Sequence, residues 1–267
     1  MSGSGALPIS DGRLALSALL ILLNLAISSL LRLGLGRPLL LASTRMVVQL
    51  LLVGGVLEWL FHQQNPLTIL GLGLVMACIA ALSAVQRTRR RFAGIYWNSL
   101  VSVLAASSLV TGAALVGIIR PQPWFAPQYL IPILGMVLGN TLNGISLGLD
   151  RLMESFVGHR ELVELRLCLG ASRWEACREL VAEAIRVGMI PTINSMMVMG
   201  LVSLPGMMTG QILQGGAPTA AVRYQIVILF MIAAATALGL VAVVLLAYLR
   251  LTSQEHQLRL DRLSSVA

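Results

Sequence analysis

The sequence contains little charge and no lysine, and this scarcity excludes a soluble globular protein before any motif is considered. Charged residues make up only 11% of the 267 residues, whereas soluble domains carry about 25%. The mean hydropathy is +0.86, and all 19 basic residues are arginine. Most of the surface of this chain is therefore suited to lipid.

The residues that catalysis or nucleotide binding would need are also missing. There is no H-E-x-x-H motif and no G-x-x-x-x-G-K-[ST] motif, and the three histidines (His62, His159, His256) fall at loops or chain ends. The run Gly144–Gly148 matches the serine-hydrolase pattern G-x-S-x-G, but that motif needs a strand-to-helix turn and a histidine partner. We expect no catalytic residue and no cofactor on this chain, so any ATP must be used by another chain.

Cysteine is scarce too, which argues against a disulfide or zinc framework. Cys78 lies in an apolar run, and Cys168 and Cys177 do not have the spacing of a zinc site. We interpret all three as small apolar filler.

Long apolar runs are what the sequence does have, and several reach the roughly 20 residues needed to cross a bilayer core. They predict an all-α membrane protein, with residues 1–267 forming a single transmembrane domain of about seven spans. The predicted spans are Leu14–Leu31, Leu39–Phe61, Leu67–Val85, Ser99–Ile119, Tyr129–Leu149, Val187–Leu204 and Val222–Leu249.

The arginines alternate by loop, with 16 on one side of the predicted spans and only Arg13, Arg120 and Arg223 on the other. Cytoplasmic loops carry an excess of Lys and Arg, so this asymmetry predicts an outside N-terminus and a cytoplasmic C-terminus. It also explains the net charge of +8 without a nucleic-acid partner. The polar tail after Thr252 is expected to be partly frayed.

Between the fifth and sixth spans lies a charged segment, residues 150–186, with 7 of the 11 acidic residues and six arginines. It predicts two short helices meeting at residues 169–172. Gly170 can take the left-handed conformation that ends a helix, and Ser172 with Glu175 fits a capping box at the start of the next. A stripe of Trp174, Cys177, Val181, Ala184 and Gly188 would share one helical face. We interpret this elbow as a docking element for a soluble partner.

Polar residues inside the spans are few, and they are candidates for a transport path. They are Arg45 and Gln49 in the second span, Asn140 and Asn143 in the fifth, and Asn194 and Ser203 in the sixth. Each has a structural alternative, because Arg45 can extend to the inner head groups and the others can hydrogen-bond between helices. The structural interpretation is favoured for each.

Helix-breaking and thioether residues gather in and after the sixth span. Pro132, Pro191 and Pro205 should kink or interrupt their helices, and Pro205-Gly206 is the strongest break and a natural hinge for a gate. Six methionines cluster there: Met189, Met196, Met197, Met199, Met207 and Met208. Thioethers suit soft cations, but methionine also fills gaps beside kinked helices, and without a matching Cys or His packing is favoured. Glycine pairs four residues apart, such as Gly144 and Gly148, predict close helix packing.

Two of these segments resemble a known family. The run 164–172 with Trp174-Glu175-Ala176 looks like the EAA-type coupling loop of ABC-transporter permeases, in which a Glu precedes the elbow Gly by six, as Glu164 precedes Gly170. The proline of the broader pattern does not follow Gly170 at its usual place. The run 200–213 closely resembles the FetB-type permeases, bacterial proteins assigned to iron export and akin to plant aluminium-tolerance proteins. The likeness spans the first to the seventh span and includes Arg45 with Gln49 and the run 223–226.

The resemblance implies a permease subunit of the bacterial inner (plasma) membrane, working as a homodimer with an ABC ATP-binding subunit that holds ATP and Mg. It implies partner coupling by Glu164, Gly170, Ala171, Ser172, Trp174 and Glu175. The gate or path would be formed by Ser203, Pro205, Gly206, Met207 and Met208. Iron export is the implied activity. The alternatives are a permease for a sugar nucleotide or lipidic molecule, or a membrane scaffold that transports nothing.

Overall fold

The computed structural model describes residues 10–62 and 65–265, and these residues are overwhelmingly helical. Six of the described helices are long and apolar enough to cross a membrane. They are α1 (Asp11–Leu30), α2 (Gly36–His62), α3 (Pro66–Gln86), α4 (Ile95–Ala114) with the π-helix η1 (Leu115–Ile119), α5 (Pro127–Gly158) and α9 (Pro218–Leu251). The prediction of an all-α polytopic membrane protein is confirmed.

The remaining helices are α6 (Arg160–Cys168), α7 (Arg173–Val198), α8 (Gly206–Leu213) and the short 3-10 helix η2 (Leu260–Arg262). The sixth predicted span, Val187–Leu204, forms the second half of α7 and the turn after it. Charge in the first half of α7 separates this helix from the six that contain a membrane-length apolar stretch. The predicted second elbow helix and the predicted sixth span are thus one continuous helix up to Val198.

Contacts divide the chain into two compact units. The first contains residues up to Gln64 with Gly210–Gly216, and the second contains Asn65–Thr209 and Ala217–Ala267. In the first unit, α1 packs against α2. The single membrane domain expected over residues 1–267 stays a prediction.

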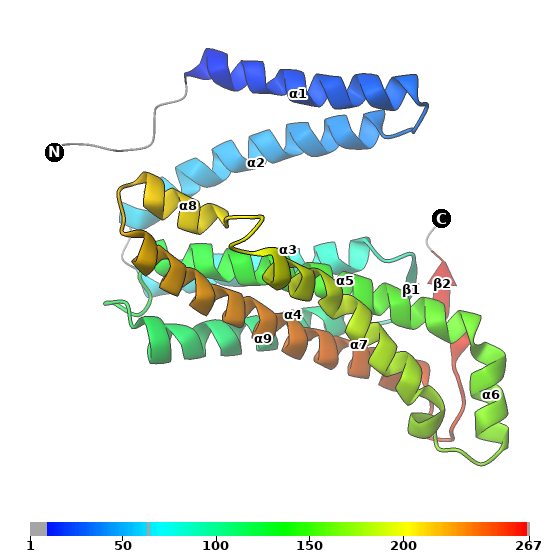
Figure 1. Cartoon of the computed structure of the whole chain (residues 1–267). Helices are drawn as coiled ribbons and strands as arrows, with labels where there is room; N and C mark the ends of the chain where they lie inside the picture. The colour runs from blue at the N-terminus through cyan, green and yellow to red at the C-terminus, as the bar shows by residue number, and fades with distance from the viewer. Residues whose placement is uncertain (1–9, 63–64, 266–267) are drawn as a thin grey trace. The chain divides into compact units, whose positions relative to one another are not determined.

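The core of the second unit is the bundle of α3, α4, α5, α7 and α9, in which α5 contacts α7 and α9 most extensively. Figure 1 shows these helices running alongside one another, with α6 at one end. Inward-facing side chains such as Ile145, Leu149 and Leu240 are fully buried. A buried hydroxyl also links two helices, because Ser99 Oγ donates to the Ala81 carbonyl oxygen at 3.1 Å.

Glycine allows the closest helix contact in this bundle. A Cβ at Gly188 of α7 would lie 2.8 Å from the carbonyl oxygen of Gly144 on α5, and a Cβ at Gly148 would lie 3.3 Å from that of Ala184. Side chains at these positions would push the backbones apart. The interpretation of Gly144 and Gly148 as packing residues, and not as a nucleophile elbow, is confirmed for these two glycines.

The three prolines differ in whether they interrupt a helix. Pro132 and Pro191 lie inside α5 and α7 without interrupting them, so the loss of one backbone donor is tolerated there. Before Pro205, however, the helix is broken as predicted. It ends at Val198 because Met199 is extended and Gly200 adopts φ +86°, and α8 begins only at Gly206.

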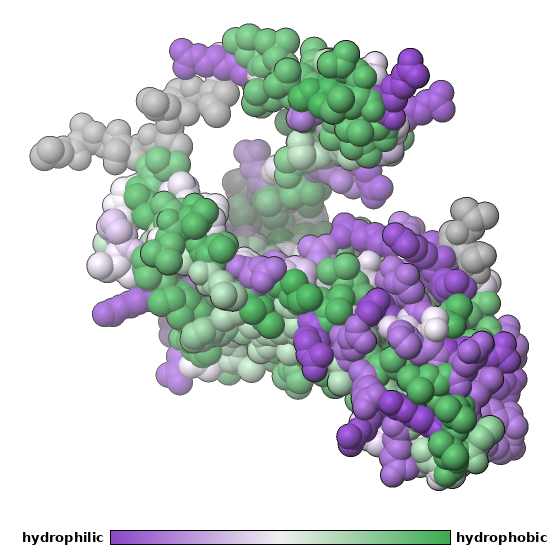
Figure 2. All heavy atoms as spheres, turned by 45° about the vertical axis from the view of Figure 1, so that its right-hand side comes forward, coloured by the Kyte–Doolittle hydropathy of each residue, from purple (hydrophilic) through white to green (hydrophobic). Residues whose placement is uncertain are grey.

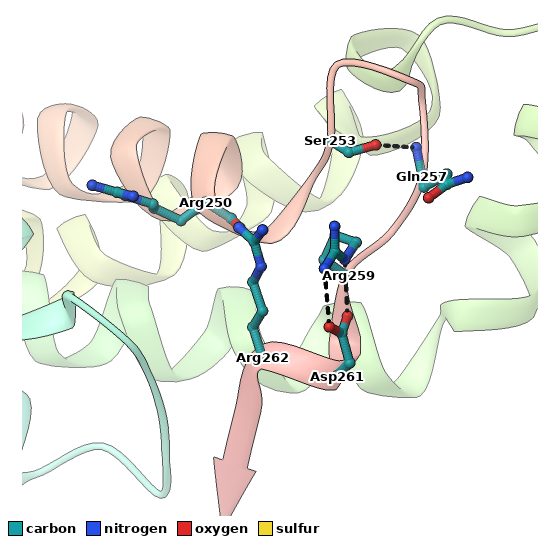
Figure 3. Close-up of polar contacts among 6 residues, drawn as sticks. All are labelled: Arg250, Ser253, Gln257, Arg259, Asp261 and Arg262. Atoms are coloured by element: carbon teal, nitrogen blue, oxygen red, sulfur yellow. Dashed lines mark hydrogen bonds and ion pairs between the residues drawn. The ribbon is translucent and has the colours of Figure 1, made fainter.

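Up to Ser265, the C-terminal tail is held by a strand pairing and by hydrogen bonds, although its polarity predicted partial fraying. Strand β2 (Leu263–Ser265) pairs antiparallel with β1 (Arg90–Phe92), the segment between α3 and α4. Figure 3 shows the contacts within the segment that connects α9 to β2. Ser253 Oγ accepts the Gln257 N–H at 3.2 Å, and Arg259 pairs with Asp261 at 3.1 Å. Arg262 donates to the Arg250 carbonyl oxygen at 2.9 Å, which fastens the tail to the last turn of α9.

Candidate functional site

The elbow between α6 and α7 is the first candidate site, and its turn is built from local backbone hydrogen bonds. Gly170 has φ +92°, a conformation that favours glycine because it has no Cβ. The Gly170 N–H donates to the Leu167 carbonyl at 3.0 Å, and the Ala171 N–H donates to the Arg166 carbonyl at 3.1 Å. This pair of bonds is the Schellman motif, which satisfies the last carbonyls of α6.

The next helix starts with the predicted capping box. Ser172 Oγ accepts the Glu175 N–H at 3.3 Å, and the Glu175 carboxylate accepts the Ser172 N–H at 2.8 Å and its hydroxyl at 2.7 Å. The hydrogen bond from the Ser172 side chain, followed by that from its backbone, lowers the pKa of Glu175. Gly170 and Ser172 therefore end one helix and begin the next with only one residue, Ala171, between them.

Ion pairs hold the two arms of the elbow together. Arg166 on α6 contacts Glu179 on α7 at 2.7 Å, and the hydrogen bond from Arg166 lowers the pKa of Glu179. Within α6, Arg160 pairs with Glu164 at 2.7 Å. The Arg166–Glu179 contact was not predicted from the sequence, although opposite charges on either side of a glycine elbow are the signal that could have suggested it.

A second ion pair joins α7 to the bundle. Arg151 of α5 contacts Glu183 of α7, with its Nε at 3.2 Å from the carboxylate oxygen. Hydrogen bonding to Arg151 lowers the pKa of Glu183. The angle of α7 is thus fixed by its glycine contact with α5 further along and by this pair near the elbow.

The elbow also leaves apolar side chains uncovered. Leu169, at the tip, is 79% exposed, and Trp174 is 46% exposed while making an edge contact with Tyr248 at 5.6 Å between ring centroids. Leu162 and Leu165 of α6 are exposed as well. Figure 2 shows hydrophilic side chains gathered around this end of the second unit, so these apolar groups stand within a polar surface.

The tail contacts the elbow directly, which sequence analysis did not predict. The Arg173 N–H at the start of α7 donates to His256 Nδ1 at 2.9 Å, and the Arg173 guanidinium donates to the Ser253 carbonyl at 3.2 Å. The elbow is therefore anchored to the segment that follows α9. No local pattern in the sequence reveals a contact between residues 83 apart.

Within the second unit, the two asparagines of α5 predicted for a path hydrogen-bond to other residues. Asn143 accepts a hydrogen bond from Arg87 at 2.5 Å, and Asn140 donates to the Met136 carbonyl of its own helix at 2.8 Å. Asn194 is exposed on α7. Arg45 and Gln49 are exposed on α2 in the other unit. Their role in a path stays a prediction.

Around the break after α7, by contrast, a cavity of about 530 Å³ is present. It is bounded by the end of α7, the turn that follows, the first turn of α8 and one face of α9. Two residues of the predicted gate, Pro205 and Met208, line it, whereas Ser203, Gly206 and Met207 are not among its lining residues. Two further methionines, Met196 and Met199, line it as well.

Comparison with known proteins places these features in a family. The model of the uncharacterised protein family UPF0014 matches residues 12–252. The chain belongs to the UPF0014 family. No solved structure matches it. The family match covers the elbow, the cavity and every helix from the first turn of α1 to the end of α9.

Curated relatives match over most of their length. A UPF0014 membrane protein of Synechocystis is 42% identical over 226 residues, covering 85% of this chain and 87% of the relative. The probable iron export permease protein FetB of Escherichia coli is 30% identical over 255 residues, 96% of this chain and 97% of the relative. The protein ALUMINUM SENSITIVE 3 of Arabidopsis thaliana is 31% identical over 251 residues, 94% and 90% respectively. The expected likeness to FetB and to plant aluminium-tolerance proteins is confirmed.

Proposed function

We propose that this chain is the membrane-spanning permease subunit of an ABC transporter and that a separate ATP-binding subunit, holding ATP and Mg, drives it. The observation that carries the proposal is the elbow. A rigid turn bearing exposed apolar side chains stands in a polar surface and continues without interruption into a helix of the bundle. The name of the Escherichia coli relative, a permease, supports the same class.

The coupling step follows from the shape of α7. Its 26 residues span roughly 39 Å at 1.5 Å per residue. Leu169 and Trp174 would insert into a groove of the ATP-binding subunit, with Glu164, Ala171 and the capped turn fixing their direction. Movement of that subunit would then displace α7 as a lever. Such coupling requires contacts that differ between the two states of the transporter.

Orientation and assembly belong to the same proposal. The arginine asymmetry supports a cytoplasmic elbow and C-terminus, an outside N-terminus, and insertion in the inner (plasma) membrane. Two copies would assemble as a permease homodimer, each with one ATP-binding subunit. The substrate would be a metal ion such as iron, exported from the cell, since the Escherichia coli relative is named for iron export.

Two alternatives predict different results. A permease for a sugar nucleotide or lipidic molecule would keep the coupled ATPase but respond to another substrate, and a membrane scaffold would have no coupled ATPase at all. The elbow favours a coupled permease over a scaffold, because a scaffold has no need for a capped, rigid turn that presents apolar side chains.

The test is co-purification with an ATP-binding subunit encoded beside this chain, followed by substrate-stimulated ATPase activity in proteoliposomes. Gly170→Val should abolish stimulation without lowering membrane insertion, because a β-branched residue is strained at φ +92°. Gly158→Val is the matched control, since Gly158 ends α5 with free space around it and no positive φ. Gly170→Asn, which tolerates the left-handed conformation, should retain most of the stimulation. Normal coupling by Gly170→Val would overturn the proposal.

A further inference from the structure

We propose that the cavity beside the end of α7 binds a soft monovalent cation, Cu(I) or its analogue Ag(I), through the thioethers of Met196, Met199 and Met208. The inference adds a site for a soft cation to the iron cargo proposed above and, as far as transport is concerned, rests on the proposed permease function. Binding itself can be measured without any transport.

Three separate segments deliver the three thioethers to one cavity. Met196 lies in the last turn of α7, Met199 begins the turn that follows, and Met208 lies in the first turn of α8. The left-handed Gly200 between them reverses the chain, and its N–H donates to the Ser203 carbonyl at 2.9 Å. The turn thereby brings methionine residues 12 positions apart in sequence to the lining of the same space.

The opposite wall supplies a buried oxygen that has no partner. One face of α9 lines the cavity through Val222, Gln225, Ile226 and Leu229, which have the spacing of a single helical face. Gln225 is only 7% exposed, and its Oε1 is buried with no hydrogen-bond donor among the described residues. A buried carbonyl oxygen without a partner is unfavourable, so rotation of the Gln225 side chain toward a cation in the cavity would give this oxygen a partner.

The donor set selects the kind of cation. Thioethers favour soft ions such as Cu(I), while hard ions require carboxylate, carbonyl or water oxygens. None of the described residues lining the cavity is ionisable. A neutral site inside an apolar bundle accommodates a single positive charge at lower cost than two or three. A site of three thioethers and one amide oxygen therefore fits Cu(I) or Ag(I) better than Fe(III) or Al(III).

The probe is Ag(I), which has the same charge and softness as Cu(I) and needs no reducing agent. Thiols would compete for it, so the full chain is purified with Cys78→Ala, Cys168→Ser and Cys177→Ala and placed in lipid nanodiscs. Equilibrium dialysis with elemental analysis gives the stoichiometry and Kd, and X-ray absorption at the silver edge identifies the ligand atoms. We expect one Ag(I) per chain with mainly sulfur ligation.

The decisive variant replaces Met196, Met199 and Met208 together with leucine, which nearly preserves volume and removes the sulfur atoms. The matched control replaces Met46, Met76 and Met136, which do not line the cavity. The first variant should lose at least tenfold in Ag(I) affinity and the second should keep it. Met208→Leu alone, expected to weaken binding by about tenfold, serves if the triple variant does not fold. Gln225→Leu should weaken binding by a smaller factor.

Equal Ag(I) affinity in the two triple variants, or no Ag(I) bound by the cysteine-free protein, would overturn the inference. Binding of Fe(II) in preference to Ag(I) would overturn it as well. Failure of the permease proposal has a different signature: no ATP-binding subunit would associate, while methionine-dependent Ag(I) binding would persist.

Discussion

Replacing Gly188 with alanine tests the crossing on which the position of α7 depends. The added Cβ would lie 2.8 Å from the Gly144 carbonyl oxygen, and because this neighbour is backbone, no side-chain rotation relieves the contact. Overpacking of this kind costs about 1–3 kcal/mol. Alanine also gains roughly 0.5–1 kcal/mol over glycine within a helix, so the net destabilisation is expected to be about 0–2.5 kcal/mol.

Gly139→Ala isolates the packing cost. Gly139 lies in α5, and a Cβ there would meet nothing within 4 Å, so this control has the helix-propensity gain without the clash. The two variants should differ in free energy of unfolding by about 1–3 kcal/mol, with Gly188→Ala the less stable. Denaturation in mixed detergent micelles, followed by tryptophan fluorescence, measures the difference. Equal stability of the two variants would show that α5 and α7 do not meet at these glycines.

Three further predictions concern the elbow and the tail. Exposed Cys168 should react rapidly with a membrane-impermeant maleimide added to inside-out vesicles but not to intact cells. Burial raises the pKa of the Cys177 thiol to about 11, so it should stay unlabelled at pH 7.5. Arg166 lowers the pKa of Glu179 in the folded protein. The stability from this pair is therefore present at pH values above about 4.3, the pKa of Glu in an unfolded chain. It is lost as the pH falls through the lower pKa that Glu179 has in the folded protein. The unfolding midpoints of wild type and Glu179→Gln should therefore converge in acid, and a constant gap would contradict the assignment. Truncation after Thr252 removes β2 and both contacts of the tail with the start of α7. Proteolysis within the elbow should then become faster, and an unchanged rate would mean that the tail does not support it.

Features formed by residues close together in the sequence could be predicted, whereas features formed by residues far apart in the sequence could not. Gly170, Ser172 and Glu175 were predictable because a Schellman turn and a capping box are made by residues within six positions of one another. The ordered tail was not, since β1 and β2 are three residues each and gain stability only from pairing across more than 170 positions. The contact between Arg173 and His256 could not be predicted for the same reason, because the two residues are far apart in the sequence.

The cavity could be predicted from the sequence only in part. The sequence placed a cluster of methionines near Pro205, and the family resemblance singled out Met207 and Met208 among them. Only the fold separates Met196, Met199 and Met208, which line the cavity, from Met207, which does not. It also adds Gln225, whose buried carbonyl oxygen no periodicity could reveal.

The continuity of α7 is what joins the two candidate sites. Sequence patterns divide this segment at Arg186, where charge gives way to apolar residues, but a helix propagates by backbone hydrogen bonds and continues through that boundary and past Pro191 to Val198. Because such a helix is stiff, a displacement at the elbow cannot be absorbed along its length. We expect it to be absorbed at the first irregular segment, the turn from Met199 to Pro205, where Gly200 is left-handed and the described chain has no regular helix. That turn is a wall of the methionine cavity, so movement of the elbow should alter the cavity before any other part of the bundle.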